Sequence, residues 1–156
     1  MVLPMATKTP RIAVVDDDPF VLRGLERLLR SAGLDVDTYA SGAAFLNAGV
    51  DDEPDCVVLD LHMPQTTGFE VQVQLVKRGR STPVIVITGD DNPEAQSRAL
   101  RLGAKGYFGK PVDDKALLAA IGVAIAGRRV CYVFLSQRAE ARAHPGNGEA
   151  LRRNAS

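Results

Sequence analysis

The sequence predicts an open, doubly wound α/β domain, in which a five-stranded parallel sheet has helices on both faces. Three observations support this fold class. Short apolar runs rich in β-branched residues alternate with amphipathic stretches. The apolar runs are almost continuous, which is typical of strands buried on both faces. Gly and Pro residues separate the two kinds of segment.

The expected elements follow this alternation. Strands are predicted at residues 12–15, 36–39, 56–59, 84–87 and 106–108. Helices are predicted at residues 19–32, 41–48, 68–77, 93–102 and 113–126. Asp18 and Pro19 begin the first helix, because Asp is a preferred N-cap and Pro suits the first helical position. We therefore assign Asp18 to capping in preference to metal ligation.

The length of 156 residues fits one domain with short extensions. Residues 1–9 are expected to be a disordered lead-in, 10–127 the domain, and 128–156 a tail that ends in disorder. Within the tail, the apolar run 130–135 extends the last helix, adds an edge strand or joins a homodimer contact. The sequence does not choose among these three.

Composition excludes several classes of protein. No apolar run approaches the roughly 20 residues that a membrane helix needs, and the start of the chain lacks a signal-peptide pattern. We expect a cytoplasmic protein with no membrane contact and with Cys56 and Cys131 reduced. Six Arg against two Glu after Gly127 leave the folded part acidic, so no direct nucleic-acid contact is expected.

Polar side chains stand at the ends of four predicted strands. Asp16 to Asp18 follow the first strand, Asp60 the third, Thr88 the fourth and Lys110 the fifth. In a parallel sheet these ends meet at one edge. Clustered carboxylates raise one another's pKa and require a cation when ionised, and Mg²⁺ suits oxygen ligands of this kind.

A hydroxyl and an ammonium beside such an ion describe a site for phosphoryl transfer. A carboxylate can be the nucleophile, and Asp60 is the candidate because it stands alone at the middle of the site. Taken singly, these residues have plainer interpretations. A run of Asp is usually a solvated turn and a Lys-Pro pair a surface turn, so only the set supports the function.

Four motifs carry a resemblance to a known family. VVDDDP, VVLDLHMPQTTGFE, PVIVITGDD and GAKGYFGKPVD closely resemble the CheY-like receiver domain of bacterial two-component response regulators. The resemblance covers residues 10–127, and the second and third motifs are most similar to the FixJ-type subgroup. It implies a flavodoxin-like fold with strand order 2-1-3-4-5.

The resemblance also implies residue roles. Asp16 and Asp17 match the acidic pair that holds Mg²⁺, and Asp60 matches the phosphoacceptor and third carboxylate ligand. The backbone carbonyl of His62 completes the protein ligands of the metal. Thr88 and Lys110 match the groups that bind phosphoryl oxygens.

Four further roles follow from the same resemblance. Pro111 follows the lysine in a bond that is usually cis in the family. Tyr107 matches an aromatic that turns inward with Thr88, although it is also explained as a half-buried strand residue. His62 and Asp90 flank the phosphoryl group and tune its hydrolysis, and the alternative for His62 is a plain exposed loop residue.

The function implied is a switch. Asp60 accepts a phosphoryl group from a sensor histidine kinase or a histidine phosphotransfer protein, and the domain catalyses only its own phosphorylation and dephosphorylation. A downstream protein is expected to bind the face made by the fourth helix and fifth strand. We expect a stand-alone receiver, because residues 128–156 lack the apolar periodicity of a DNA-binding domain. The alternatives are a truncated FixJ-type transcriptional regulator and a non-switching interaction module.

Overall fold

The computed structural model describes residues 9–48 and 53–142, of which 129–142 are described by their backbone alone. Its contacts divide the chain into two units, Met1–Ile125 and Ala126–Ser156. The site and the sheet belong to the first unit. The expected lead-in, apart from its last residue, and the end of the expected tail lie outside the described residues.

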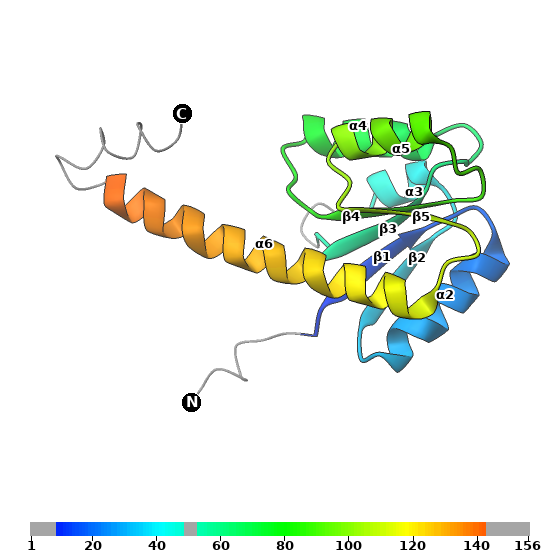
Figure 1. The fold of residues 1–156 in the computed structure, drawn as a ribbon, viewed down its shortest axis with the longest axis horizontal. Coiled ribbons are helices and arrows are strands. Elements are labelled where there is room, and N and C mark those ends of the chain that lie inside the picture. Colours follow the sequence, from blue (N-terminus) through cyan, green and yellow to red (C-terminus); the bar gives the residue numbers. More distant parts are fainter. Residues whose placement is uncertain (1–8, 49–52, 143–156) are drawn as a thin grey trace. The chain divides into compact units, whose positions relative to one another are not determined.

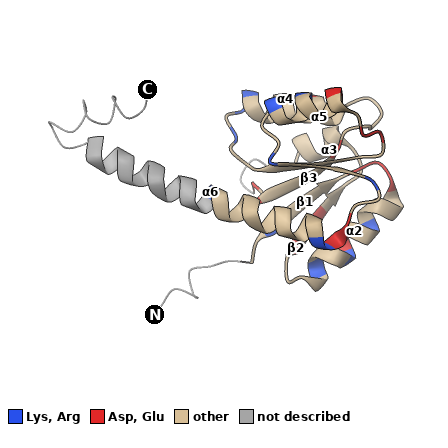
Figure 2. Cartoon of the chain, viewed as in Figure 1, with Lys and Arg blue, Asp and Glu red and all other residues tan. Residues whose placement is uncertain are grey.

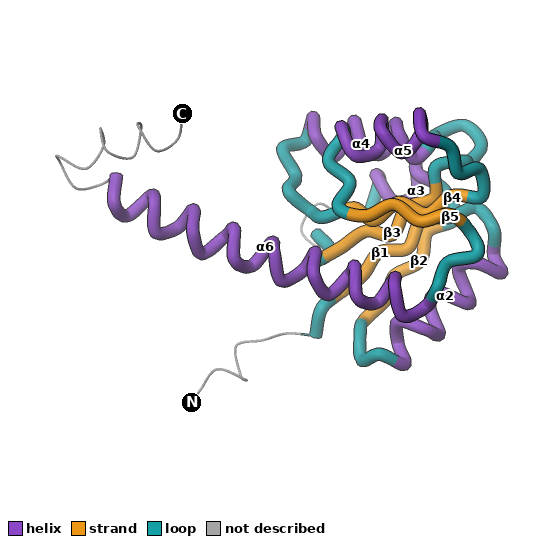
Figure 3. The backbone as a smooth tube through the Cα atoms, in the orientation of Figure 1, coloured by secondary structure: helices purple, strands orange, loops and turns teal. Residues whose placement is uncertain are grey.

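Five parallel strands form one sheet in the order β2-β1-β3-β4-β5, which confirms the predicted fold (Figure 3). The strands are β1 (Arg11–Val15), β2 (Asp35–Tyr39), β3 (Cys56–Asp60), β4 (Val84–Thr88) and β5 (Gly106–Gly109). Asp60 and Thr88 are the last residues of their strands and not the first residues of the loops. The backbone pairing of the sheet therefore fixes the backbone of both residues.

Five helices alternate with the strands: α2 (Pro19–Ser31), α3 (Gly42–Leu46), α4 (Gly68–Lys77), α5 (Pro93–Arg101) and α6 (Asp114–Arg142). Helix α3 is shorter than predicted, because Ser41 caps it by accepting the N–H of Ala44 and Asn47 is its C-cap. Helix α6 is longer than predicted. Its backbone includes residues 130–135, for which the sequence had left helix, edge strand and dimer contact open.

The helices cover the sheet in two layers (Figure 1). On one face, α2 and α6 bury Leu29, Leu117 and Ile121. On the other face, α3, α4 and α5 bury Phe45 and Val71, among others. Alternate residues of a strand serve the two faces, so β3 and β4, which are buried on both faces, read as almost continuous apolar runs. The apolar interior leaves the polar chemistry to the edge where the strands end.

Gly68 sets the path of the chain after Asp60. Its N–H donates to the carbonyl of Leu61 at 3.0 Å, and Thr67 and Glu70 close a capping box around the start of α4. A Cβ atom at Gly68 would lie 2.4 Å from the Asp60 carbonyl oxygen. The structure thus shows a close approach of α4 to the end of β3 at this glycine.

Replacing Gly68 is therefore expected to destabilise the domain. Gly68→Ala forces α4 away from β3 and should lower the free energy of unfolding by about 1–3 kcal/mol, measured by urea denaturation. Gly24→Ala in α2 is the matched control, since a Cβ atom added at Gly24 would meet no other atom within 4 Å. That variant should gain about 0.5–1 kcal/mol. Equal effects at the two glycines would contradict the close approach.

Candidate functional site

Three carboxylates meet at the edge where the strands end. Asp16 and Asp17 follow β1, Asp60 ends β3, and one oxygen of each lies within 4.8 Å of the others. Asp16 is 0% exposed and Asp60 is 2% exposed, whereas Asp17 is open to solvent. Figure 2 shows acidic segments at this edge, between β1 and α2 and before α5. The structure thus brings the predicted acidic residues together.

Lys110 places its ammonium against both buried carboxylates. Its Nζ lies 2.8 Å from Oδ2 of Asp16 and 3.5 Å from Oδ1 of Asp60. Burial lowers the pKa of Lys110, but the hydrogen bond and the charge of Asp16, with the charge of Asp60, outweigh burial and raise it. The lysine is therefore a permanent cation. The Lys110–Pro111 peptide bond is cis.

Of the two buried carboxylates, Asp60 is the one with an unpaired oxygen. Within the described residues, its buried Oδ1 accepts no hydrogen bond, and the 3.5 Å contact with Lys110 is an ion pair beyond ordinary hydrogen-bond length. Burial, followed by the negative charge of Asp16, raises the pKa of Asp60, and Lys110 opposes that rise. An unpartnered, electron-rich oxygen is available for a cation or an electrophile.

This set of donors fits a hard divalent cation. Mg²⁺ takes oxygen ligands and usually keeps several waters beside one or two carboxylates. Asp16 and Asp60 supply buried oxygens, and Asp17 leaves one side of the cluster exposed for water or phosphate. The unpartnered oxygen of Asp60 is the observation that favours such an ion. Ligation by the backbone carbonyl of His62 stays a prediction.

Thr88 is engaged with its own loop. Its hydroxyl accepts the N–H of Asp90 at 3.1 Å and contacts the Asp90 carbonyl oxygen at 3.3 Å, as donor. These bonds hold the hydroxyl in the loop that leads to α5. Any bond from Thr88 to a group on Asp60 has to replace them.

His62 and Asp90 face each other across the mouth of the site. Nε2 of His62 lies 3.8 Å from Oδ2 of Asp90, and both side chains are largely exposed. They come from the loops that follow β3 and β4, and they form an ion pair only when the imidazole is protonated. The structure therefore places the two predicted tuning residues as a pair.

Tyr107 packs against the face of the sheet that α3, α4 and α5 cover. Its hydroxyl oxygen is buried and has no hydrogen-bond partner within the part of the chain that the structure describes. Burial, and next the charge of Asp91, raise the pKa of this phenol. The sequence interpretation had missed Asp91, the second Asp of the motif PVIVITGDD. The inward turn of Tyr107 together with Thr88 stays a prediction.

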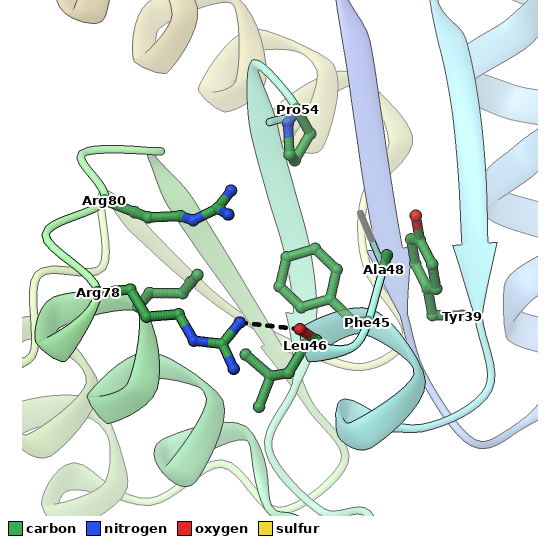
Figure 4. Close-up of a pocket in the computed structure, with 8 residues that line it drawn as sticks. Tyr39, Phe45, Leu46, Ala48, Pro54, Arg78 and Arg80 are labelled. Carbon is green, nitrogen blue, oxygen red and sulfur yellow. Dashed lines mark hydrogen bonds between the residues drawn. The ribbon is translucent and has the colours of Figure 1, made fainter. Parts of the chain in front are cut away.

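A pocket on another part of the domain shares no residue with this site (Figure 4). Tyr39 and Phe45 form its apolar side, and Arg78 reaches across it to donate to the carbonyl of Leu46 at 2.8 Å. None of its lining residues is a carboxylate. The predicted chemistry thus lies at the strand ends and not in this pocket.

Comparisons with known proteins agree with the geometry. The family model for the response regulator receiver domain matches residues 12–122. The transcriptional regulatory protein FixJ of Azorhizobium caulinodans is 42% identical over 110 residues, covering 70% of this chain and 52% of FixJ. The response regulator protein TodT of Pseudomonas putida is 36% identical over 121 residues, covering 78% of this chain and 53% of TodT.

A solved structure of response regulator StyR superposes with a TM-score of 0.75 at 34% identity, covering 92% of this chain and 74% of StyR. The chain spans about half the length of the curated relatives FixJ and TodT. Among the helices that the structure describes, none is long and apolar enough to cross a membrane.

Asp18 should contribute to stability and not to metal binding. Its carboxylate accepts the N–H of Phe20 at 2.9 Å as the N-cap of α2, and it is not part of the carboxylate cluster. Asp18→Ala is expected to lower the free energy of unfolding by about 1 kcal/mol, while Mg²⁺ affinity measured by titration stays within about twofold. A loss of Mg²⁺ affinity as large as that of Asp17→Ala would contradict this assignment.

Asp60→Asn should stabilise the domain near neutral pH, because it removes a buried charge that Asp16 repels. We expect the free energy of unfolding of the variant to exceed that of the wild type at about pH 7. Since the folded-state pKa of Asp60 is raised, the wild type itself gains stability as the pH falls through that pKa. The difference between variant and wild type should therefore shrink towards about pH 4 in urea titrations. A difference that grows on acidification would refute the raised pKa.

Proposed function

Because this chain belongs to the response regulator receiver domain family, we propose that Asp60 accepts a phosphoryl group from a phosphohistidine. The donor is a sensor histidine kinase or a histidine phosphotransfer protein. The observation that carries the proposal is the buried Asp60 oxygen, which has no hydrogen-bond partner among the described residues and faces Lys110 beside two further carboxylates. Such an oxygen is a nucleophile with its charge neutralisation already in place.

The proposed transfer conserves atoms and charge. An oxygen of Asp60 attacks phosphorus while the P–N bond of the donor breaks, and the electron pair leaves with the imidazole nitrogen, which takes a proton from solvent. Asp16, Asp17 and Asp60 would hold Mg²⁺, which neutralises charge on the phosphoryl oxygens when bound. Lys110 supplies the second positive charge.

Water then hydrolyses the acyl phosphate on Asp60. Attack on phosphorus breaks the bond to the Asp60 oxygen and releases inorganic phosphate. We propose that His62 and Asp90, whose Nε2 and Oδ2 atoms lie 3.8 Å apart, orient or obstruct that water and so set how long the phosphoryl group persists. In this proposal the chain acts on its own side chain and is not an enzyme for other substrates.

Phosphorylation is proposed to rearrange the loop before α5. The phosphoryl group adds about −1.5 to −2 charges, which attract the Thr88 hydroxyl and Lys110. Thr88 must then give up its two contacts with Asp90, and the loop moves with it. Two charge-assisted hydrogen bonds of roughly 1.5–3 kcal/mol each approach the ~5.5 kcal/mol needed for a nearly complete change of state. Tyr107 moves inward with Thr88, and a downstream protein reads the face made by α5 and β5.

A non-switching interaction module is the weaker interpretation. It would not need an acidic pair, a nucleophile, a hydroxyl and an ammonium at one edge, and the structure holds all of them there. A stand-alone role in the cytoplasm and a role beside a DNA-binding domain both stay predictions for this chain. Both use the same switch in the described domain.

The proposal is tested by phosphorylation with a small donor. Acetyl phosphate with Mg²⁺ should add one phosphoryl mass to the wild type, detected by intact mass spectrometry. Asp60→Asn should abolish the addition, because no other buried carboxylate has an unpartnered oxygen in the described residues. Asp17→Ala should reduce Mg²⁺ affinity and labelling together, by about tenfold or more.

Asp35→Asn is the matched control, since Asp35 is an exposed carboxylate at the opposite end of a strand. It should be labelled as well as the wild type. Labelling of Asp60→Asn at the wild-type level would overturn Asp60 as the acceptor.

A further inference from the structure

Helix α5, which the proposed switch moves, is held to the rest of the domain at few points. Among its nine residues only Ala99 is buried. The other residues of the helix are exposed or half-buried, and half-buried Ala95 also packs against the apolar cluster, so the one fully buried anchor of α5 is Ala99, near its carboxyl-terminal end. A second contact at Ala99 therefore affects how firmly the carboxyl-terminal end of α5 is held.

Gln72 makes that contact. Its side chain, 1% exposed on α4, donates through Nε2 to the carbonyl oxygen of Ala99 at 3.0 Å. The same carbonyl accepts the N–H of Ala104 at 3.0 Å, in the turn that ends α5 at Gly103. The amide nitrogen must face Ala99, because a carbonyl oxygen only accepts.

Filling space does not explain this glutamine. Its Oε1 is buried and has no hydrogen-bond partner within the described residues. A buried amide with an unpaired oxygen is costly, and an apolar side chain of similar length would occupy the position without that cost. The bond to Ala99 is the one feature of Gln72 that such a side chain cannot supply.

A second link joins the two helices at the neighbouring residue. The guanidinium of Arg98 lies over the ring of Phe69, 4.2 Å from its centroid. Phe69 and Gln72 lie one turn apart on α4, and Arg98 and Ala99 are adjacent on α5. Both links therefore hold the carboxyl-terminal part of α5.

The other end of α5 depends on the site. Asn92 caps it by accepting the N–H of Ala95, and the loop from Thr88 to Asp91 joins this cap to β4. The Thr88 hydroxyl is bonded to Asp90 within that loop. Movement of Thr88 is thus transmitted to the amino-terminal end of the helix.

We propose that Gln72 is a positioning residue that pins the carboxyl-terminal end of α5 to α4, so that α5 turns about Ala99 when the Thr88 loop moves. The tether itself is a property of the unphosphorylated domain. Only its use as a pivot rests on the proposed function of Asp60. The two parts can be measured separately in the same protein.

The first experiment tests the tether without any phosphodonor. Gln72→Met keeps the length of the side chain but has no donor, so amide hydrogen exchange at Gly103 and Ala104 should become about fivefold faster. The midpoint of thermal unfolding should stay unchanged or rise, because the unpaired amide is gone. Gln74→Met on the same helix is the control and should exchange as the wild type does. Equal exchange in all three proteins would overturn the tether.

The second experiment adds acetyl phosphate with Mg²⁺. In the wild type, changes in exchange should be confined to the Thr88 loop and the first turn of α5; in Gln72→Met they should extend to Ala104. Mass spectrometry should show equal labelling of both proteins. Identical exchange profiles in both labelled proteins would overturn the pivot. If the wild type is not labelled, the proposed function fails, while the exchange difference without donor still decides the tether. Gln72→Leu replaces Gln72→Met if the latter does not fold.

Discussion

The arrangement of the site depends on the ammonium of Lys110 between two buried carboxylates. Asp16 and Asp60 repel each other in an environment with little water, and the ion pairs at 2.8 and 3.5 Å offset that repulsion. Lys110 offsets the negative charge of the two carboxylates unequally, because it is hydrogen-bonded to Asp16 but only forms a longer ion pair with Asp60. Asp60 therefore keeps an unpartnered oxygen and a raised pKa. In the proposed function, this unpartnered oxygen of Asp60 binds the cation and accepts the phosphoryl group.

The parallel register brings these groups together. Asp60 at the end of β3 pairs with Ile87, and Thr88 at the end of β4 pairs with Gly109, immediately before Lys110. The sequence predicts this edge to within one residue, because the change from an apolar run to Asp, Thr or Lys marks where a strand buried on both faces ends. The order of the strands and the assignment of the functional residues came from the resemblance of four motifs. Each strand is one residue longer than predicted, because the backbone pairing of the sheet continues past the apolar run.

Other features depend on distances that no local pattern encodes. The close approach of Gly68 to the Asp60 carbonyl needs α4 to lie at one particular depth on β3. The preference of Lys110 for Asp16 over Asp60 depends on the path of the chain after β5. Gln72 reads in the sequence as a polar residue on an amphipathic helix, and only the packing of α5 against α4 shows it to be buried. Sequence patterns state which face a residue occupies, but the neighbour across an interface is set by the packing of whole elements.

Unsatisfied polar atoms show where the domain gives up stability. In the described residues, the buried side-chain atoms without a hydrogen bond are Oδ1 of Asp60, Oε1 of Gln72 and the Tyr107 hydroxyl oxygen. They lie at the site, between α4 and α5, and on the strand beside α5. None of the three belongs to a residue of the core cluster under α2 and α6. Each unsatisfied atom raises the free energy of the conformation described here. The free-energy difference between this conformation and an alternative one is therefore smaller. In the proposed switch, a charge added at Asp60 therefore acts on the face that carries α5, while the strands keep their places.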